Sequence, residues 1–192
     1  MVPPDRHAAI EESIFRAVNV DGGRALDALG LLLSSPVFGA VAGAAVALLV
    51  WYRRRHAGWW RWLAALGLAL LLSDAVGSQL LRPAVARMRP AYALAPGSVR
   101  WIAPAANVGS IPSLHTSNFF AMALVVTAAW PPVWVVAYPL AAGVGWSRMY
   151  VGVHWPGDVV AGAAWGTLCA AVALALTRAR RPPPPGGRVH ER

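Results

Sequence analysis

Long stretches of this sequence carry almost no charge, and they restrict the possible fold more than any other feature. Of the 192 residues, 57% are apolar and only 13% are charged. Soluble globular chains carry about 25% charged residues. The charges gather at residues 1–27, 53–61, 82–100 and 178–192, and the stretches between them are nearly free of charge. This pattern is typical of membrane-spanning helices joined by loops.

A membrane span needs about 20 mostly apolar residues, with a range of about 17–25. The sequence offers candidates at residues 36–52, 62–81, 114–130, 133–146 and 159–177, of which the fourth is short. Many of the tryptophans lie at the ends of these stretches, where membrane proteins place aromatic side chains. We therefore predict an all-α integral-membrane helical bundle of about five spanning helices, with residues 36–177 as the transmembrane domain.

Residues 1–35 differ from the rest because polar and apolar side chains alternate in them. Ile10, Ile14 and Phe15 are interleaved with Glu11 and Glu12. We predict amphipathic interfacial helices that lie on the membrane surface. A soluble helical cap on the bundle is the alternative. Residues 178–192 are basic and rich in proline, and we predict a cytoplasmic tail without a packed core.

The basic residues also predict an orientation. Five spans place the arginines of 53–61 and those after residue 177 on one side, which the positive-inside rule makes cytoplasmic. The opposite side nevertheless carries five arginines, and these need another explanation: Arg82, Arg87, Arg89, Arg100 and Arg148. The net charge of +9 does not favour nucleic acid as a partner, because the basic residues flank apolar stretches.

Three polar segments share that outer face, namely residues 82–90, 111–116 and 147–158. The first chemistry they suggest is phosphate binding. Arg82 and Arg89 are seven residues apart, close to two helical turns, so they can share a helix face. A guanidinium group can bind two oxygens of one phosphate. Ser113 follows a proline and precedes an apolar stretch, which indicates a helix start with free N–H groups for an anion. Arg148 adds a third cation.

Two histidines and one carboxylate complete the set. His154 and Asp158 are four residues apart, with Pro156 and Gly157 between them. An aspartate in the first turn of a helix can accept the Nδ1–H of His154, which leaves Nε2 as a nucleophile. His115 is then the candidate that protonates the leaving oxygen and later activates water.

These segments resemble the three-part signature of the type 2 phosphatidic acid phosphatase superfamily. That signature reads Lys-x6-Arg-Pro, Pro-Ser-Gly-His and Ser-Arg-x5-His-x3-Asp, and the resemblance covers roughly residues 62–177. It implies that Arg82, Arg89, Ser113, Leu114 and Arg148 form the phosphate site. It also implies a catalytic set in which His154 is the nucleophile, Asp158 its partner and His115 the general acid. Two positions depart from the pattern, since Arg82 replaces a lysine and Leu114 replaces a glycine. We expect Leu114 to be the first residue of the helix, where a leucine is not strained.

The resemblance implies a metal-independent lipid phosphatase without a cofactor, acting through a phosphohistidine. The predicted topology places this site on the extracytoplasmic face of the cell membrane. Its chain length and amphipathic start are similar to those of bacterial polyprenyl-pyrophosphate phosphatases, so polyprenyl pyrophosphate is the expected substrate. Phosphatidylglycerophosphate and phosphatidic acid are alternatives. So are phosphoryl transfer between lipids and a lipid-binding membrane protein without catalysis. Asp74 lies inside a predicted span, and we expect it to be buried and either hydrogen-bonded or protonated. The sequence predicts no oligomeric state.

Overall fold

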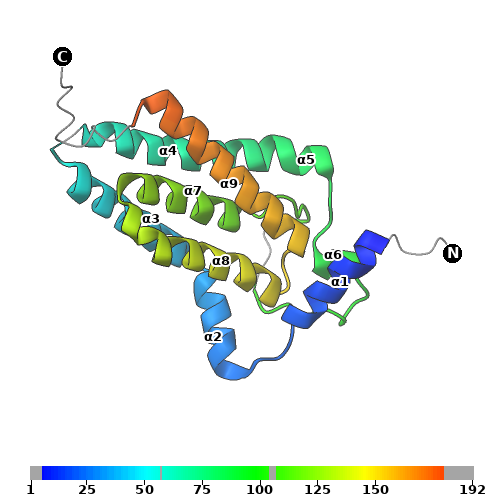
Figure 1. Cartoon of the computed structure of the whole chain (residues 1–192). Coiled ribbons are helices and arrows are strands. Elements are labelled where there is room, and N and C mark those ends of the chain that lie inside the picture. The colour runs from blue at the N-terminus through cyan, green and yellow to red at the C-terminus, as the bar shows by residue number, and fades with distance from the viewer. Residues whose placement is uncertain (1–5, 57, 104–106, 180–192) are drawn as a thin grey trace, which may run out of the picture.

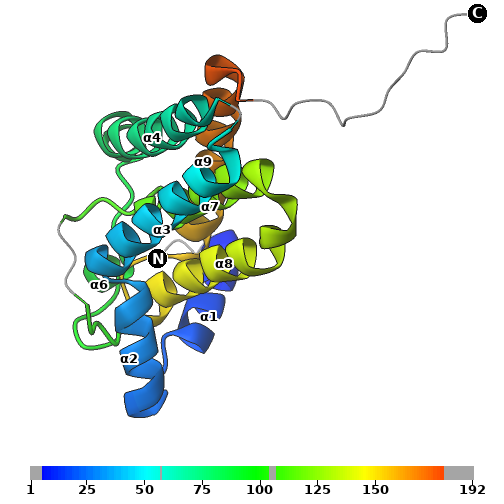
Figure 2. The ribbon, with the colours of Figure 1, turned by 90° about the vertical axis from the view of Figure 1, so that its left-hand side faces the viewer.

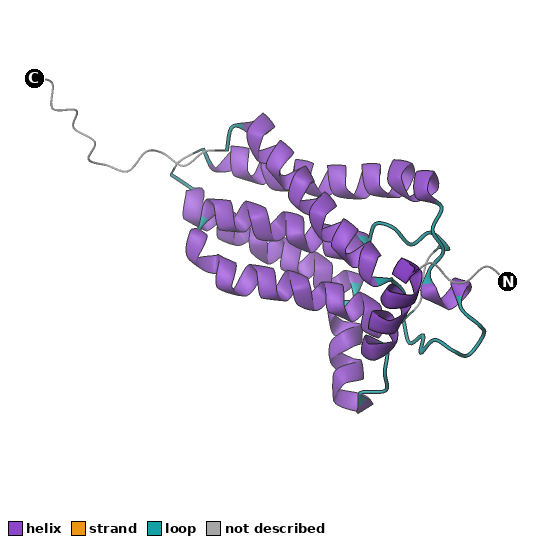
Figure 3. Ribbon diagram, turned by 45° about the vertical axis from the view of Figure 1, so that its right-hand side comes forward, coloured by secondary structure: helices purple, strands orange, loops and turns teal. Residues whose placement is uncertain are grey.

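The chain folds into helices joined by loops in the computed structural model, which describes residues 6–56, 58–103 and 107–179 (Figure 1). The helices are α1 (Arg6–Val18), α2 (Gly23–Leu33), α3 (Pro36–Arg54), α4 (Trp59–Val76), α5 (Arg82–Val85), α6 (Pro90–Ala93), α7 (Leu114–Ala129), α8 (Trp134–Tyr150) and α9 (Pro156–Thr177). A π-helical turn, Gly77–Leu81, joins α4 to α5, and a 3₁₀ turn, Pro131–Val133, precedes α8. Within these described ranges no strand occurs, as Figure 3 shows, and the predicted all-α class is confirmed.

The helices begin and end where the local sequence requires it. Ser35 is the N-cap of α3, and its hydroxyl accepts the N–H of Val37 while Pro36 occupies the first helical position. Gly58 turns the chain between α3 and α4 with a φ of 62°, which glycine adopts without strain. Pro156 opens α9 in the same way as Pro36 opens α3.

Five helices, α3, α4, α7, α8 and α9, form the bundle, and α7 contacts the other four. Figure 2 shows these helices running together, while α2 turns away from them at one end. Three helical stretches are long and apolar enough to cross a membrane: Pro36–Arg54, Trp59–Val85 and Pro156–Thr177. Helices α7 and α8 have 16 and 17 residues, and at 1.5 Å per residue they fall somewhat short of a hydrocarbon core of about 30 Å.

The interior of the bundle is built from small side chains. Alanines on four helices are fully buried, namely Ala65, Ala69, Ala121, Ala141, Ala170 and Ala173. Large apolar side chains point outward instead, among them Val37, Val41, Leu48, Leu71, Val136, Val160 and Leu176, each more than half exposed. Small residues inside and large apolar residues outside are what a helical bundle in lipid requires.

The N-terminal helices lie at one end of the bundle, beside the long connection between α5 and α7 (Figure 1). Helix α1 packs on α8 and α9, and α2 packs on α8 and α3. Ile10 and Ile14 of α1 remain about half exposed, whereas Phe15 is buried. The interfacial location predicted for residues 1–35 stays a prediction, and the structure adds that both helices also cover the bundle end.

Candidate active site

The three polar segments predicted from the sequence meet at this covered end. The first comes from α5 and the loop that follows it, the second is the start of α7, and the third is the end of α8 with the loop into α9. Met88 and Gly109 form an isolated antiparallel bridge, which ties the first segment to the stretch before α7. The Ser113 N–H donates to the Asp158 carbonyl over 3.0 Å and ties the second segment to the third.

His154 and Asp158 form a hydrogen-bonded pair in the interior. The distance from His154 Nδ1 to Asp158 Oδ2 is 3.3 Å, and the two side chains are 1% and 0% exposed. Asp158 Oδ2 also accepts the Trp155 N–H over 2.8 Å and the Ser110 hydroxyl. A carboxylate only accepts hydrogen bonds, so Nδ1 of the neutral ring carries the proton and Nε2 keeps its lone pair.

Burial holds the His154 ring in its neutral form. It lowers the pKa of His154 to about 3, with the nearby charges of Arg89 and Arg148 acting in the same direction, while the hydrogen bond to Asp158 opposes them. A neutral imidazole at physiological pH has a lone pair available for attack on phosphorus.

Arg89 reaches the other side of the same ring. Its Nη1 lies 2.9 Å from His154 Nε2 and 2.9 Å from the Val153 carbonyl. Its Nε and Nη2 donate to the backbone and side-chain oxygens of Asn107. Burial, reinforced by the charge of Arg82, lowers the pKa of Arg89 to about 10, so the guanidinium stays charged at neutral pH. The donor that now touches Nε2 is therefore positioned to bind a phosphate oxygen beside the nucleophile.

Arg82 and Arg148 each have one buried donor without a partner in the described part of the chain. Arg82 Nη2 lies 3.4 Å from the Pro112 carbonyl and Arg148 Nη1 donates to the Ser34 carbonyl over 3.2 Å, but both Nε groups are unpaired. Buried guanidinium donors are nearly always paired, and an anion would satisfy these two.

The start of α7 follows the expectation from the sequence. Ser113 is the buried N-cap and Leu114 is the first helical residue. The Leu114 side chain packs against Gly77, where an added Cβ would lie 2.6 Å from Leu114 Cδ2. His115 follows, close to the Ser34 backbone and to the charges of Arg82, Arg89 and Arg148. The first N–H groups of α7 therefore lie among the arginines, as an anion site requires.

Two arginines of this face, Arg87 and Arg100, had no role predicted from the sequence, and the structure pairs both with carboxylates. Arg87 bridges two carboxylates, Glu11 on α1 and Asp158 on α9. Arg100 pairs with Asp27 over 2.6 Å. The sequence pattern indicated no site role for either arginine, and none for Glu11, Ser110 or Asn107. The excess of arginines on the outer face was the one available signal.

The expectation for Asp74 was half right. The side chain is exposed rather than buried, yet it is hydrogen-bonded, because Asn118 Nδ2 donates to Asp74 Oδ1 over 3.2 Å. The partner lies on α7, one turn beyond His115, so Asp74 sits at the α4–α7 contact instead of facing the bundle core.

Comparison with known proteins gives consistent matches. Residues 62–182 match the model of the PAP2 superfamily. A lipid A 4'-phosphatase of Bacteroides thetaiotaomicron is 30% identical over 112 residues, which is 55% of this chain and 49% of the relative. The chain thus aligns with about half the length of that curated relative.

Two crystal structures share the fold. LpxE of Aquifex aeolicus superposes with a TM-score of 0.69 at 24% identity, covering 91% of this chain and 99% of that one. A transmembrane PAP2-type phosphatidylglycerolphosphate phosphatase of Bacillus subtilis superposes with a TM-score of 0.66 at 18% identity, covering 94% and 90%. At these identities the likeness concerns the fold.

Proposed function

Because the chain belongs to the PAP2 superfamily, we propose that it is a membrane lipid phosphatase that works through a phosphohistidine at His154. One observation supports this proposal above the others. His154 is buried, neutral and hydrogen-bonded through Nδ1 to Asp158, while its Nε2 lies among arginine donors. Such an arrangement suits a nucleophile that attacks an anionic phosphorus centre.

The reaction proceeds in two steps. His154 Nε2 attacks phosphorus, the bond to the lipid oxygen breaks, and His115 gives a proton to that oxygen. Water then attacks the phosphohistidine and passes a proton to His115, the P–N bond breaks, and inorganic phosphate leaves. Arg82, Arg89 and Arg148, together with the N–H groups at the start of α7, neutralise the charge on the phosphoryl oxygens in both steps.

The substrate is a phosphate carried by a lipid, and we place phosphomonoesters first. The relatives are named for lipid A and phosphatidylglycerolphosphate, so these precede polyprenyl pyrophosphate, the substrate expected from the sequence. The catalytic end is proposed to face the outside of the cell membrane, because the arginines at the end of α3 and those that follow α9 in the sequence fit the cytoplasmic side.

A phosphate-release panel tests the proposal. Purified protein in detergent should release phosphate from one or more of these lipids with EDTA present, and His154→Ala should abolish the release. Dependence on added Mg²⁺, or no release from any lipid of the panel, would contradict it. Adding an alcohol acceptor compares hydrolysis with phosphoryl transfer, since a hydrolase releases mainly inorganic phosphate whereas a transferase forms mainly the phosphorylated alcohol.

A further inference from the structure

One face of α1 lies on the loop that carries the proposed nucleophile. Glu11 and Phe15 are four residues apart on α1, and Asn19, the first residue after the helix, continues the same face because its N–H donates to the Phe15 carbonyl over 2.8 Å. We call residues 151–157, which join α8 to α9 and include the first two residues of α9, the catalytic loop. Helix α1 packs against both helices that flank this loop, at the bundle end seen in Figure 1.

The three side chains contact the loop at successive points. Asn19 Nδ2 donates to the Tyr150 carbonyl over 2.8 Å, just before the loop begins. The Phe15 ring is 1% exposed, and its centroid lies 5.2 Å from that of Trp155. Glu11 Oε1 accepts the Gly157 N–H over 2.7 Å, at the start of α9.

Glu11 also reaches the catalytic carboxylate through one arginine. Its Oε2 accepts a hydrogen bond from Arg87 Nη2, and Arg87 Nη1 donates to Asp158 Oδ1 over 3.1 Å. Asp158 is fully buried, and a buried carboxylate needs charged and hydrogen-bonding partners to remain ionised and fixed in place. Glu11, Arg87, Asp158 and His154 thus form one continuous chain of contacts.

Gly157 makes this approach possible. A Cβ added at Gly157 would lie 2.6 Å from Glu11 Oε1 and 3.2 Å from Arg87 Nη1. Any larger residue at position 157, which lies between His154 and Asp158 in the sequence, would therefore push the Glu11 side chain away.

We propose that α1 acts as a clamp on the catalytic loop, with Glu11 and Arg87 as positioning residues that orient Asp158 and thereby His154. Neither residue touches the substrate in this account, and Glu11 lies outside the stretch that matches the family model. The clamp rests on the proposed role of His154. It also gives residues 6–18 a function beyond membrane contact.

The test compares Glu11→Gln and Arg87→Gln with Glu12→Gln. Glu12 is the adjacent residue on α1 and pairs with the exposed Arg16, so its variant makes the same charge change away from the loop. We expect Glu11→Gln and Arg87→Gln to lower kcat by a factor on the order of 10 to 100, as misplaced catalytic groups do. KM should stay within about twofold because phosphate contacts are unchanged. Glu12→Gln should match the wild type.

The double variant separates positioning from a general loss of fold. If Glu11 and Arg87 act as one unit, the double variant is no slower than the worse single variant. Gly157→Ala should be harmful in the wild type and less harmful beside Glu11→Ala, which removes the clashing carboxylate. Equal activity of Glu11→Gln and Glu12→Gln, or a change in KM alone, would overturn the clamp. A wild type without phosphatase activity would overturn the proposed function instead.

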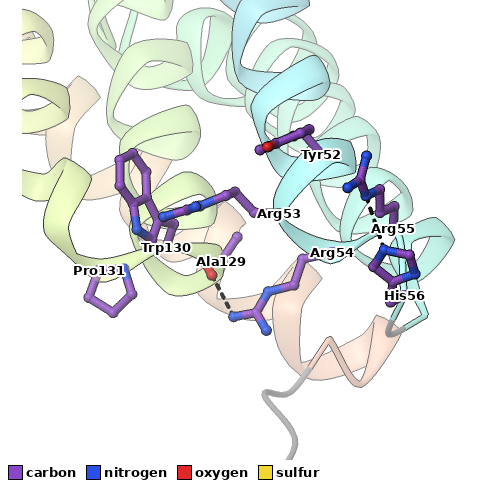
Figure 4. A pocket seen from close by; sticks show the side chains of 8 residues that line it. All are labelled: Tyr52, Arg53, Arg54, Arg55, His56, Ala129, Trp130 and Pro131. Carbon is purple, nitrogen blue, oxygen red and sulfur yellow. Dashed lines mark hydrogen bonds between the residues drawn. The ribbon is translucent and has the colours of Figure 1, made fainter.

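A separate feature at the opposite end of the bundle supports a second inference. An open cavity of about 430 Å³ lies between the end of α3 and the turn from α7 to α8. Figure 4 shows the side chains that line it. Its lining combines a run of basic residues with aromatic and turn residues: Tyr52, Arg53, Arg54, Arg55, His56, Ala129, Trp130 and Pro131.

Two arginines that line this cavity lie over aromatic rings. The Arg53 guanidinium carbon lies 3.9 Å from the centre of the Trp130 ring, and that of Arg55 lies 4.9 Å from the centre of the Tyr52 ring. No Asp or Glu lines the cavity in the described residues. Arg55 Nε also donates to His56 Nε2 over 3.1 Å. The remaining N–H groups of a guanidinium that lies over a ring can bind an anion, and phosphate oxygens fit their geometry.

From this charge and shape we infer that the cavity binds the phosphate headgroup of an anionic membrane lipid. The test embeds the protein in nanodiscs that mix phosphatidylglycerol with phosphatidylcholine and counts the retained lipids by native mass spectrometry. The variant Arg53→Gln should retain fewer phosphatidylglycerol molecules than Arg24→Gln, a matched control that removes one charge from the exposed surface of α2. Equal retention would overturn the inference. So would displacement of the lipid by excess inorganic phosphate, which would make the ligand a free anion.

Discussion

At the scale of single residues, the chemistry of His154 is set by what surrounds its ring. Asp158 fixes the proton on Nδ1, and burial keeps the ring neutral. Arg89 Nη1 donates a hydrogen bond to Nε2, and a bound phosphate oxygen would accept that N–H instead. A histidine in water has a pKa of about 6.5 and would be partly protonated near neutral pH. The site therefore supplies a nucleophile that does not need to lose a proton first.

This state predicts a clear result in NMR spectra of histidine-labelled protein. Because the pKa of His154 is lowered to about 3, its ring should keep the chemical shifts of the neutral Nδ1–H form from pH 8 down to about pH 4. The spectrum of His154→Ala identifies the signal by its absence. A signal from His154 that titrates near pH 6.5 would show that the ring is not held neutral by burial.

The spacing of residues in the sequence was sufficient to predict contacts between residues within about one helical turn of each other. Ser113 at the start of a helix and the His154–Asp158 pair both follow from short-range helical geometry, and the structure has both. Glu11 and Arg87 could not be predicted in the same way. Glu11 contacts Gly157 across 146 residues of sequence, and only the docking of α1 brings them together.

At the scale of elements, the contact between α7 and α9 sets the distance between Ser113 and Asp158 in the site. A Cβ added at Gly162 would lie 2.5 Å from the Ser113 carbonyl oxygen, and one at Gly166 only 1.9 Å from that of Ser117. The two glycines are four residues apart and let the helix backbones touch. Ser113 and Asp158 are held together at the end of this contact.

Substituting Gly166 should therefore harm both stability and activity. Gly166→Ala places its Cβ against backbone that cannot move aside, and overpacking of this kind costs about 1–3 kcal/mol. We expect a lower Tm in detergent and a lower kcat, because α9 shifts against α7. Gly67→Ala is the matched control, since Gly67 lies in a helix with no atom near its added Cβ. Equal Tm values for the two variants would contradict the close contact.

The sequence predicted the helices of the bundle well because apolar length is a local property. It predicted 62–81 for a stretch that is helical from Trp59 to Val85, since polar residues at its ends obscured the boundaries. The order of the helices around α7 could not be predicted, because it depends on which small residues fit against one another.

At the scale of the whole molecule, the two ends of the bundle differ in charge. Arg87 and Arg100 at the catalytic end pair with carboxylates and also lie over aromatic rings. At the other end Arg53 and Arg55 lie over aromatic rings, and no carboxylate among the described residues pairs with them. The proposed orientation places the first end outside the cell and the second end in the cytoplasm.

Cysteine labelling in intact cells tests this orientation. Cys169 is buried in α9, and Cys169→Ser provides a background without thiols. In that background, Ser98→Cys in the exposed loop at the catalytic end should react with a membrane-impermeant maleimide. His56→Cys at the other end should react only after the membrane is permeabilised. The reverse pattern would contradict the orientation without affecting the proposed chemistry.

The central claim is the covalent intermediate on His154, and trapping it is the most direct test. Enzyme turning over a lipid with a radiolabelled phosphate is quenched in alkali, where phosphohistidine survives, and its peptides are mapped. We expect acid-labile label on the peptide that contains His154, with none in His154→Ala. Label on another residue, or a wild type that turns over rapidly yet carries no label at any quench time, would contradict it.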